Sequence, residues 1–140
     1  MSRYCLDTSA YSNFKRGDPR VIELLEKASW IGVPSIVLGE LAAGFEKGSH
    51  RDRNFAELEE FLEAPVIEVL PLEKEAAFIF GALVKKLSDL GKPIPTNDIW
   101  ISAICAACGA TLLTYDDHFR NVERIGVHVL ETPARKLTAK

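Results

Sequence analysis

The chain has 140 residues, of which 47% are hydrophobic and 26% are charged, a balance that excludes an intrinsically disordered chain. This length predicts one domain over residues 1–140, large enough to bury a substantial core. The formal net charge of -3 provides no basic excess that would by itself indicate nucleic-acid binding.

Short apolar strands are predicted to alternate with amphipathic helices. In chain order, we expect a strand at Arg3–Leu6, a helix at Pro19–Lys27, a strand at Trp30–Val33, helices at Ser35–Lys47 and Asp52–Glu63, a strand at Val66–Leu70, helices at Leu72–Leu90 and Asn97–Cys108, a strand at Thr111–Thr114, and a fifth strand at Val127–Leu130. Asp18 before Pro19 is a helix start signal, and Gly91 and Gly109 are stop signals. The alternation predicts an α/β domain with a mainly parallel sheet.

Acidic residues recur at corresponding places in this layout. Asp7 follows the first strand and Asp116 follows the fourth, while Glu40 and Asp98 lie in otherwise apolar helical segments. Ligands of open parallel sheets bind beyond the carboxyl ends of the strands, so Asp7 and Asp116 belong on that edge. A poorly solvated Glu40 needs a partner, which is a basic side chain, a set of hydrogen bonds or a metal ion.

Each acid also has an ordinary structural interpretation. Asp98 fits the first turn of a helix as a complement to the helix dipole, Asp116 or Asp117 fits the cap of the short DHFRNVE segment, and Asp7 fits a turn. For one acid alone we favour that interpretation. For all four at corresponding positions we favour a shared site, because a carboxylate cluster takes up protons or divalent cations.

The residue types point to phosphate chemistry. Oxygen ligands favour Mg²⁺ or Mn²⁺, which assist phosphodiester hydrolysis by activating water and offsetting developing negative charge. Thr8, Ser9 and Thr114 flank the acids and are candidates for holding a carboxylate in place, although hydroxyls are also common at strand ends. Asn97 is interpreted equally well as an orienting neighbour of Asp98 or as a helix cap.

Four stretches of the chain, LDTSAY, PSIVLGELAAG, PTNDIWISAICAACG and TLLTYDDHF, resemble the four acidic motifs of the PIN domain, in the order of that family. The resemblance spans nearly the whole chain and is greatest to the VapC-type toxins of type II toxin-antitoxin systems. It implies a three-layer α/β/α sandwich around a mainly parallel sheet of four to five strands. By motif matching, it also implies that Asp7, Glu40, Asp98 and Asp116 are the catalytic, metal-binding acids, with Asp117 as an outer ligand or helix cap.

The same resemblance implies a Mg²⁺- or Mn²⁺-dependent endoribonuclease that cuts structured RNA such as tRNA or rRNA and so inhibits translation. Such toxins form homodimers and are neutralised by a small VapB-like antitoxin. Three rival classes remain: a PIN-like scaffold that binds RNA or a partner without cutting, a receiver-type phosphoacceptor module, whose aspartate after a middle strand is missing here, and a haloacid-dehalogenase-like phosphatase. The phosphatase would need a second aspartate where this chain has Ser9.

Other features are less informative. Cys5, Cys105 and Cys108 cannot all pair within the chain, which suits a reducing, cytoplasmic compartment, and we expect Cys105 and Cys108 to be core residues. We expect no membrane association, because Gly109 interrupts the longest uncharged run. The histidines show no ligand spacing, and His118 is expected to be structural or RNA-facing. Basic residues after the first two strands are either phosphate contacts or a solvated face: Lys15, Arg16, Arg20, Lys47, Arg51 and Arg53.

Overall fold

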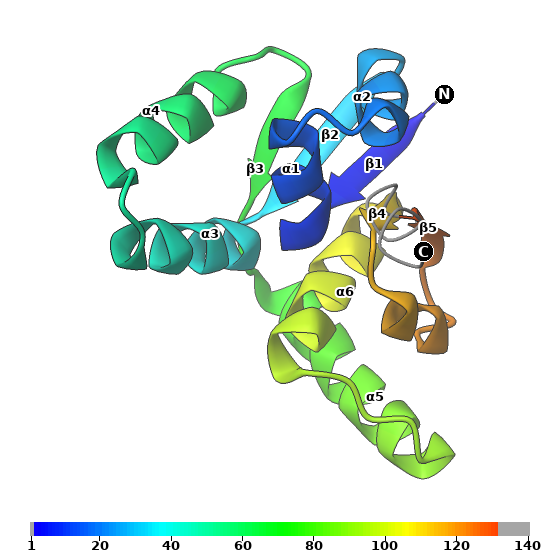
Figure 1. Ribbon diagram of the computed structural model, residues 1–140. Helices are drawn as coiled ribbons and strands as arrows, with labels where there is room; N and C mark the ends of the chain where they lie inside the picture. The colour runs from blue at the N-terminus through cyan, green and yellow to red at the C-terminus, as the bar shows by residue number, and fades with distance from the viewer. Residues whose placement is uncertain (1, 132–140) are drawn as a thin grey trace, which may run out of the picture.

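The computed structural model of the chain describes residues 2–131 and contains one five-stranded parallel sheet in the order β3-β2-β1-β4-β5 (Figure 1). The strands are β1 (Arg3–Leu6), β2 (Trp30–Pro34), β3 (Ile67–Leu70), β4 (Thr111–Thr114) and β5 (Gly126–Val129). Each lies within one or two residues of its predicted position. All four strand pairings are parallel, so the prediction of a mainly parallel sheet is confirmed.

The order of the strands reverses at β1. The chain proceeds outward from β1 through β2 to β3, and then returns to place β4 on the other side of β1. Leu6 pairs with Leu113 in the β1–β4 register, so these two strands end side by side. A reversal of this kind leaves a crevice at the carboxyl ends of the two strands, which is where ligands bind in such sheets.

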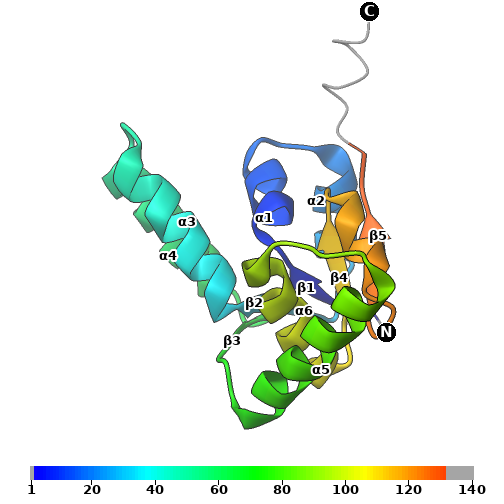
Figure 2. The same ribbon diagram turned by 90° about the horizontal axis from the view of Figure 1, so that it is seen from below.

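Helices cover both faces of the sheet and form a three-layer sandwich. The helices α1 (Thr8–Lys15) and α2 (Pro19–Glu26) lie on one face, and α5 (Lys74–Leu90) and α6 (Thr96–Cys108) lie on the other (Figure 2). A third pair, α3 (Ser35–Lys47) and α4 (Arg51–Leu62), forms a hairpin that projects away from the sheet. The inner end of this hairpin contacts α1 and α6 through α3.

The predicted helix boundaries follow from local signals in the sequence. Asp18 caps α2 by accepting a hydrogen bond from the backbone nitrogen of Arg20, with Pro19 in the first turn. Gly91 and Gly109 end α5 and α6 with φ angles of 67° and 65°, in the left-handed region that glycine adopts without steric cost. The helix predicted from Leu72 begins later, at Lys74, because Glu73 still has an extended backbone.

The core lies between the sheet and its two helical layers. Leu6, Leu112 and Leu113 of the central strands are fully buried, and Ile101 and Cys105 of α6 pack against them as predicted for that helix. Phe80 of α5 stacks on Trp100 of α6 at 3.5 Å between ring centroids. Across residues 2–131, the helices are too short or too polar to cross a bilayer.

Candidate active site

A pocket of about 580 Å³ opens where the carboxyl ends of β1 and β4 meet the first turns of α1 and α6 and the middle of α3. Its lining residues come from α1, α3, the start of α6 and the segment after β4: Asp7, Thr8, Ser9, Glu40, Pro95, Thr96, Asn97, Asp98 and Asp116. All four predicted acids therefore lie around one space. The acids are separated by up to 109 positions in the sequence, and the sheet topology brings them together.

Asp7 is the most enclosed of the four acids, with 3% of its surface exposed. It caps α1: its Oδ1 accepts hydrogen bonds from the backbone nitrogen of Ala10 at 2.8 Å and from Ser9 Oγ at 2.7 Å. Its Oδ2 accepts a hydrogen bond from Thr114 Oγ1 at 2.5 Å. Asp7 is thus a turn and cap residue, as its structural interpretation predicted, and a pocket residue as well.

Burial raises the pKa of Asp7 to about 6, although the hydrogen bonds from Thr114, Ala10 and Ser9 act in the opposite direction. The negative charge of Asp116 raises the pKa further. Because this carboxylate remains costly to ionise even with three donors around it, a cation placed beside it would favour its ionised form.

The hydroxyls of Ser9 and Thr114 connect β4 to Asp7. Ser9 Oγ accepts a hydrogen bond from the backbone nitrogen of Tyr115 at 2.9 Å, and Thr114 Oγ1 accepts one from the backbone nitrogen of Asp116 at 3.0 Å. Each hydroxyl therefore receives one hydrogen bond from the turn after β4 and donates one to Asp7. Their predicted position beside the acids is confirmed.

The partners of Glu40 are two neutral hydrogen-bond donors, and among the described residues it has no basic partner. Thr8 Oγ1 donates to its Oε1 at 2.5 Å, and Asn97 Nδ2 donates to its Oε2 at 3.3 Å. These contacts connect α3 to α1 and to α6. Both interpretations of Asn97 are therefore wrong. Its side chain donates to Glu40 and not to Asp98, and it does not cap α6, which begins at Thr96 with Pro95 at its cap position.

Asp98 lies in the first turn of α6 and is paired with His118, whose Nε2 is 2.7 Å from Asp98 Oδ2. Burial raises the pKa of Asp98, the contact with His118 lowers it, and the charges of Glu40 and Asp116 raise it. His118 is a member of the site that was not predicted from the sequence. The sequence signal that could have indicated it is its position, two residues after Asp116 in the segment that follows β4.

The two aspartates after β4 occupy different environments. Asp116 lines the pocket and takes the cap position of the 3₁₀ helix η1 (Asp117–Asn121), without a hydrogen bond from its side chain to that helix. Asp117 is exposed, pairs with Arg120 and does not line the pocket. Asp116, the acid that motif matching selects over Asp117, is therefore the one that lies in the pocket.

The donor set is compatible with a divalent cation, although the acids are spread around the pocket. Within residues 2–131, no three acidic, histidine or cysteine side chains are placed to ligate one ion together. Mg²⁺, however, is commonly held by one or two carboxylates together with water molecules. In the same part of the chain, no lysine or arginine pairs with any of the four acids, and only His118 contacts one of them as a potential cation.

Comparisons with known proteins agree with this architecture. The sequence matches the PIN domain family over residues 4–125. It is 33% identical over 132 residues to Ribonuclease VapC2 of Rickettsia felis, covering 91% of this chain and 96% of that protein. It is also 33% identical over 129 residues to Ribonuclease VapC2 of Haemophilus influenzae, covering 89% of this chain and 93% of the relative.

A solved structure shows the same fold. The VapBC2 crystal structure from Rickettsia felis, bound to a DNA fragment from its promoter, superposes with a TM-score of 0.79 at 30% identity, covering 91% of this chain and 98% of the matched chain. The chain therefore belongs to the PIN-domain family and, within it, to the VapC ribonucleases.

Proposed function

We propose that the chain is the toxin of a VapBC-type toxin-antitoxin system and a Mg²⁺- or Mn²⁺-dependent endoribonuclease. Its substrate would be structured RNA, such as tRNA or rRNA, and its cleavage would inhibit translation. One observation carries the proposal. Four carboxylates from four separate segments line one pocket, and among the described residues no lysine or arginine neutralises them.

The cation would lie among Asp7, Glu40, Asp98 and Asp116, with one or two of these carboxylates bound directly and the others acting through water molecules. When bound, such a cation supplies a more acidic water and positive charge for the phosphate under attack. The raised pKa values of Asp7 and Asp98 support this assignment, because burial makes both carboxylates costly to ionise and the charges of neighbouring acids add to that cost.

The surrounding residues orient the acids. Ser9 and Thr114 hold both oxygens of Asp7, Thr8 and Asn97 hold the two oxygens of Glu40, and His118 holds Oδ2 of Asp98. Side chains fixed in this way keep their geometry when a substrate enters. In-line attack by water would leave a 5'-phosphate and a 3'-hydroxyl.

A VapB-like antitoxin is the partner we assign to this chain, since the Rickettsia felis relative was crystallised as a VapBC2 assembly. We further propose that the protein is a cytoplasmic homodimer. A reducing compartment agrees with three free cysteines, two of which are buried.

Cleavage of purified tRNA and rRNA in Mg²⁺ or Mn²⁺ tests the proposal, with EDTA and Asp98→Asn as controls. The new 5' ends are then mapped by sequencing. Discrete cuts that require metal and disappear in the variant are expected. Cleavage that persists in EDTA, or in Asp98→Asn, would overturn the metal-dependent mechanism at this site. No cleavage with either metal would overturn the nuclease and leave the scaffold interpretation.

A further inference from the structure

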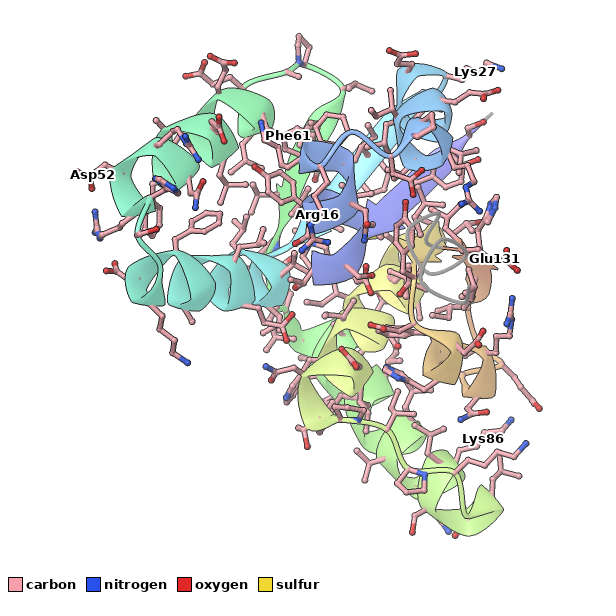
Figure 3. The ribbon with its side chains drawn as sticks, viewed as in Figure 1. Arg16, Lys27, Asp52, Phe61, Lys86 and Glu131 are labelled. Carbon is pink, nitrogen blue, oxygen red and sulfur yellow. The ribbon has the colours of Figure 1, made fainter. Side chains whose placement is uncertain are left out.

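A second hollow of about 420 Å³ lies between α1 and the α3–α4 hairpin, and we refer to it as the hairpin groove. Its wall on the α1 side includes Ser12, Lys15 and Arg16, and its wall on the hairpin side includes Phe45, Arg53 and Asn54. Figure 3 shows Arg16 at the end of α1, in the space between the body of the protein and the hairpin.

The hairpin groove continues from the acidic pocket. Thr8 and Glu40 line the pocket, and the following turns of the same two helices, with Ser12 on α1 and Leu41 and Phe45 on α3, line the groove. Thr8 and Glu40, which are hydrogen-bonded to each other, therefore lie next to the residues that line the groove. An eight-residue helix is about 12 Å long, so Arg16 stands roughly that far from the acids.

Two arginines of the groove are free to bind an anion. Arg16 and Arg53 are exposed, and neither makes an ion pair with any residue that the structure describes. Arg51, two residues before Arg53, is instead held by Glu46 at 2.7 Å and Asp52 at 2.8 Å. Glu57 also lines the groove and is the acid among its lining residues; it lies 3.7 Å from Lys15, in a loose contact between two half-exposed groups.

We propose that the hairpin groove binds the backbone of the RNA strand that leads into the acidic pocket, with Arg16 and Arg53 contacting its phosphates. This inference rests on the proposed ribonuclease function. A pocket lined by four acids repels a polyanion, so binding energy for RNA must come from cations outside that pocket. Guanidinium groups pair with phosphate oxygens in two-pronged geometry, and Arg16 and Arg53 face one groove from opposite walls.

The test separates binding from cleavage. Fluorescein-labelled tRNA is titrated with the full-length protein carrying Asp98→Asn, in EDTA, at several salt concentrations, with and without Arg16→Gln and Arg53→Gln. Each phosphate contact adds about 0.7 to 0.9 to the slope of log K against log salt, so the double replacement should lower the slope by roughly 1.4 to 1.8. In the otherwise unchanged enzyme, the same pair should raise KM and leave kcat nearly constant.

Two control variants remove the same charge elsewhere. Arg124→Gln removes an exposed arginine between η1 and β5 that forms no ion pair within residues 2–131, and Arg51→Gln removes one that is already neutralised. Both should keep the wild-type salt slope. An unchanged slope in the Arg16/Arg53 variant, or an equal loss in Arg124→Gln, would overturn the proposal. If the salt slope of the Arg16/Arg53 variant is unchanged, these arginines do not contact RNA phosphates, and the groove is left for another acidic partner, such as a protein segment. Because no metal is present in the binding assay and no RNA is cleaved, its result can be interpreted independently of the test for nuclease activity.

Discussion

Thr114 and Asp7 are joined by a 2.5 Å hydrogen bond, although 107 positions separate them in the sequence. The bond exists because β1 and β4 are neighbouring parallel strands with Leu6 opposite Leu113, so the residues that follow lie side by side. Thr114 is fully buried, and Asp7 is almost so. The contact therefore holds Asp7, the most enclosed carboxylate of the pocket, against β4, the strand that Asp116 follows.

We predict that Thr114→Val destabilises the fold by about 1 to 3 kcal/mol, because it leaves Oδ2 of Asp7 buried without its donor. Urea denaturation measures this change. Thr111→Val on the same strand is the matched control, because the Thr111 side chain is partly exposed and makes no hydrogen bond among the described residues. Equal stability losses in the two variants would contradict the role given to Thr114.

His118→Ala should lower RNA cleavage by about 10- to 100-fold, the usual effect of removing a residue that orients a metal-binding side chain. His118 lowers the pKa of Asp98, so its loss should also move the acidic limb of the pH–rate profile to higher pH. His128→Ala, which removes an exposed histidine on β5, should leave the profile unchanged. A lower rate with an unshifted profile would assign His118 a role other than holding Asp98.

The shared location of the acids could be predicted from the sequence. Asp7 and Asp116 follow parallel strands, and strand ends of one parallel sheet meet at one edge. Glu40 stood out because its helix is otherwise apolar in the first turns, and Asp98 because it opens a buried helix. These are consequences of element order and residue type, which do not require knowledge of side-chain contacts.

The contacts among the side chains could not be predicted. The bond between Asp7 and Thr114 depends on a strand register that hydrophobic pattern alone does not fix between two buried strands. His118 reaches Asp98 only because η1 turns the chain back toward α6. Asn97 faces Glu40 because α6 starts at Thr96, a one-residue difference that sequence signals rarely resolve.

The two hydrogen-bond donors to Glu40 should contribute unequally to the stability of the fold. Thr8 donates at 2.5 Å in a partly buried position, and Asn97 donates at 3.3 Å from an exposed one. We expect Thr8→Val to cost about 0.5 to 1.5 kcal/mol of unfolding free energy, and Asn97→Ala less than about 0.5 kcal/mol. Valine keeps the branched shape of threonine, so helix propensity changes little. Chemical denaturation and cleavage rates should rank the two variants in the same order, and the reverse order would contradict this account of Glu40.

Asp7→Asn should make the metal-free protein more stable at neutral and alkaline pH. Burial raises the pKa of Asp7 from 3.8 to about 6, so between these values the folded state binds more protons than the unfolded state, and stability falls as pH rises. Above pH 6, the ionised wild-type side chain costs roughly 3 kcal/mol relative to its neutral form. Asparagine avoids that cost and retains an oxygen for Ser9 and Ala10.

Unfolding of both proteins in EDTA from pH 3.5 to pH 8 measures the difference, which should grow between about pH 4 and pH 6 and then level off. Asp117→Asn is the control, because Asp117 is exposed and lies outside the pocket lining. Adding Mg²⁺ at pH 8 should stabilise the wild type more than Asp7→Asn, since only the wild type retains the charge that a cation offsets. A constant difference across the pH range would show that Asp7 titrates normally in the fold, and equal stabilisation of both proteins by Mg²⁺ would remove Asp7 from the set of metal ligands.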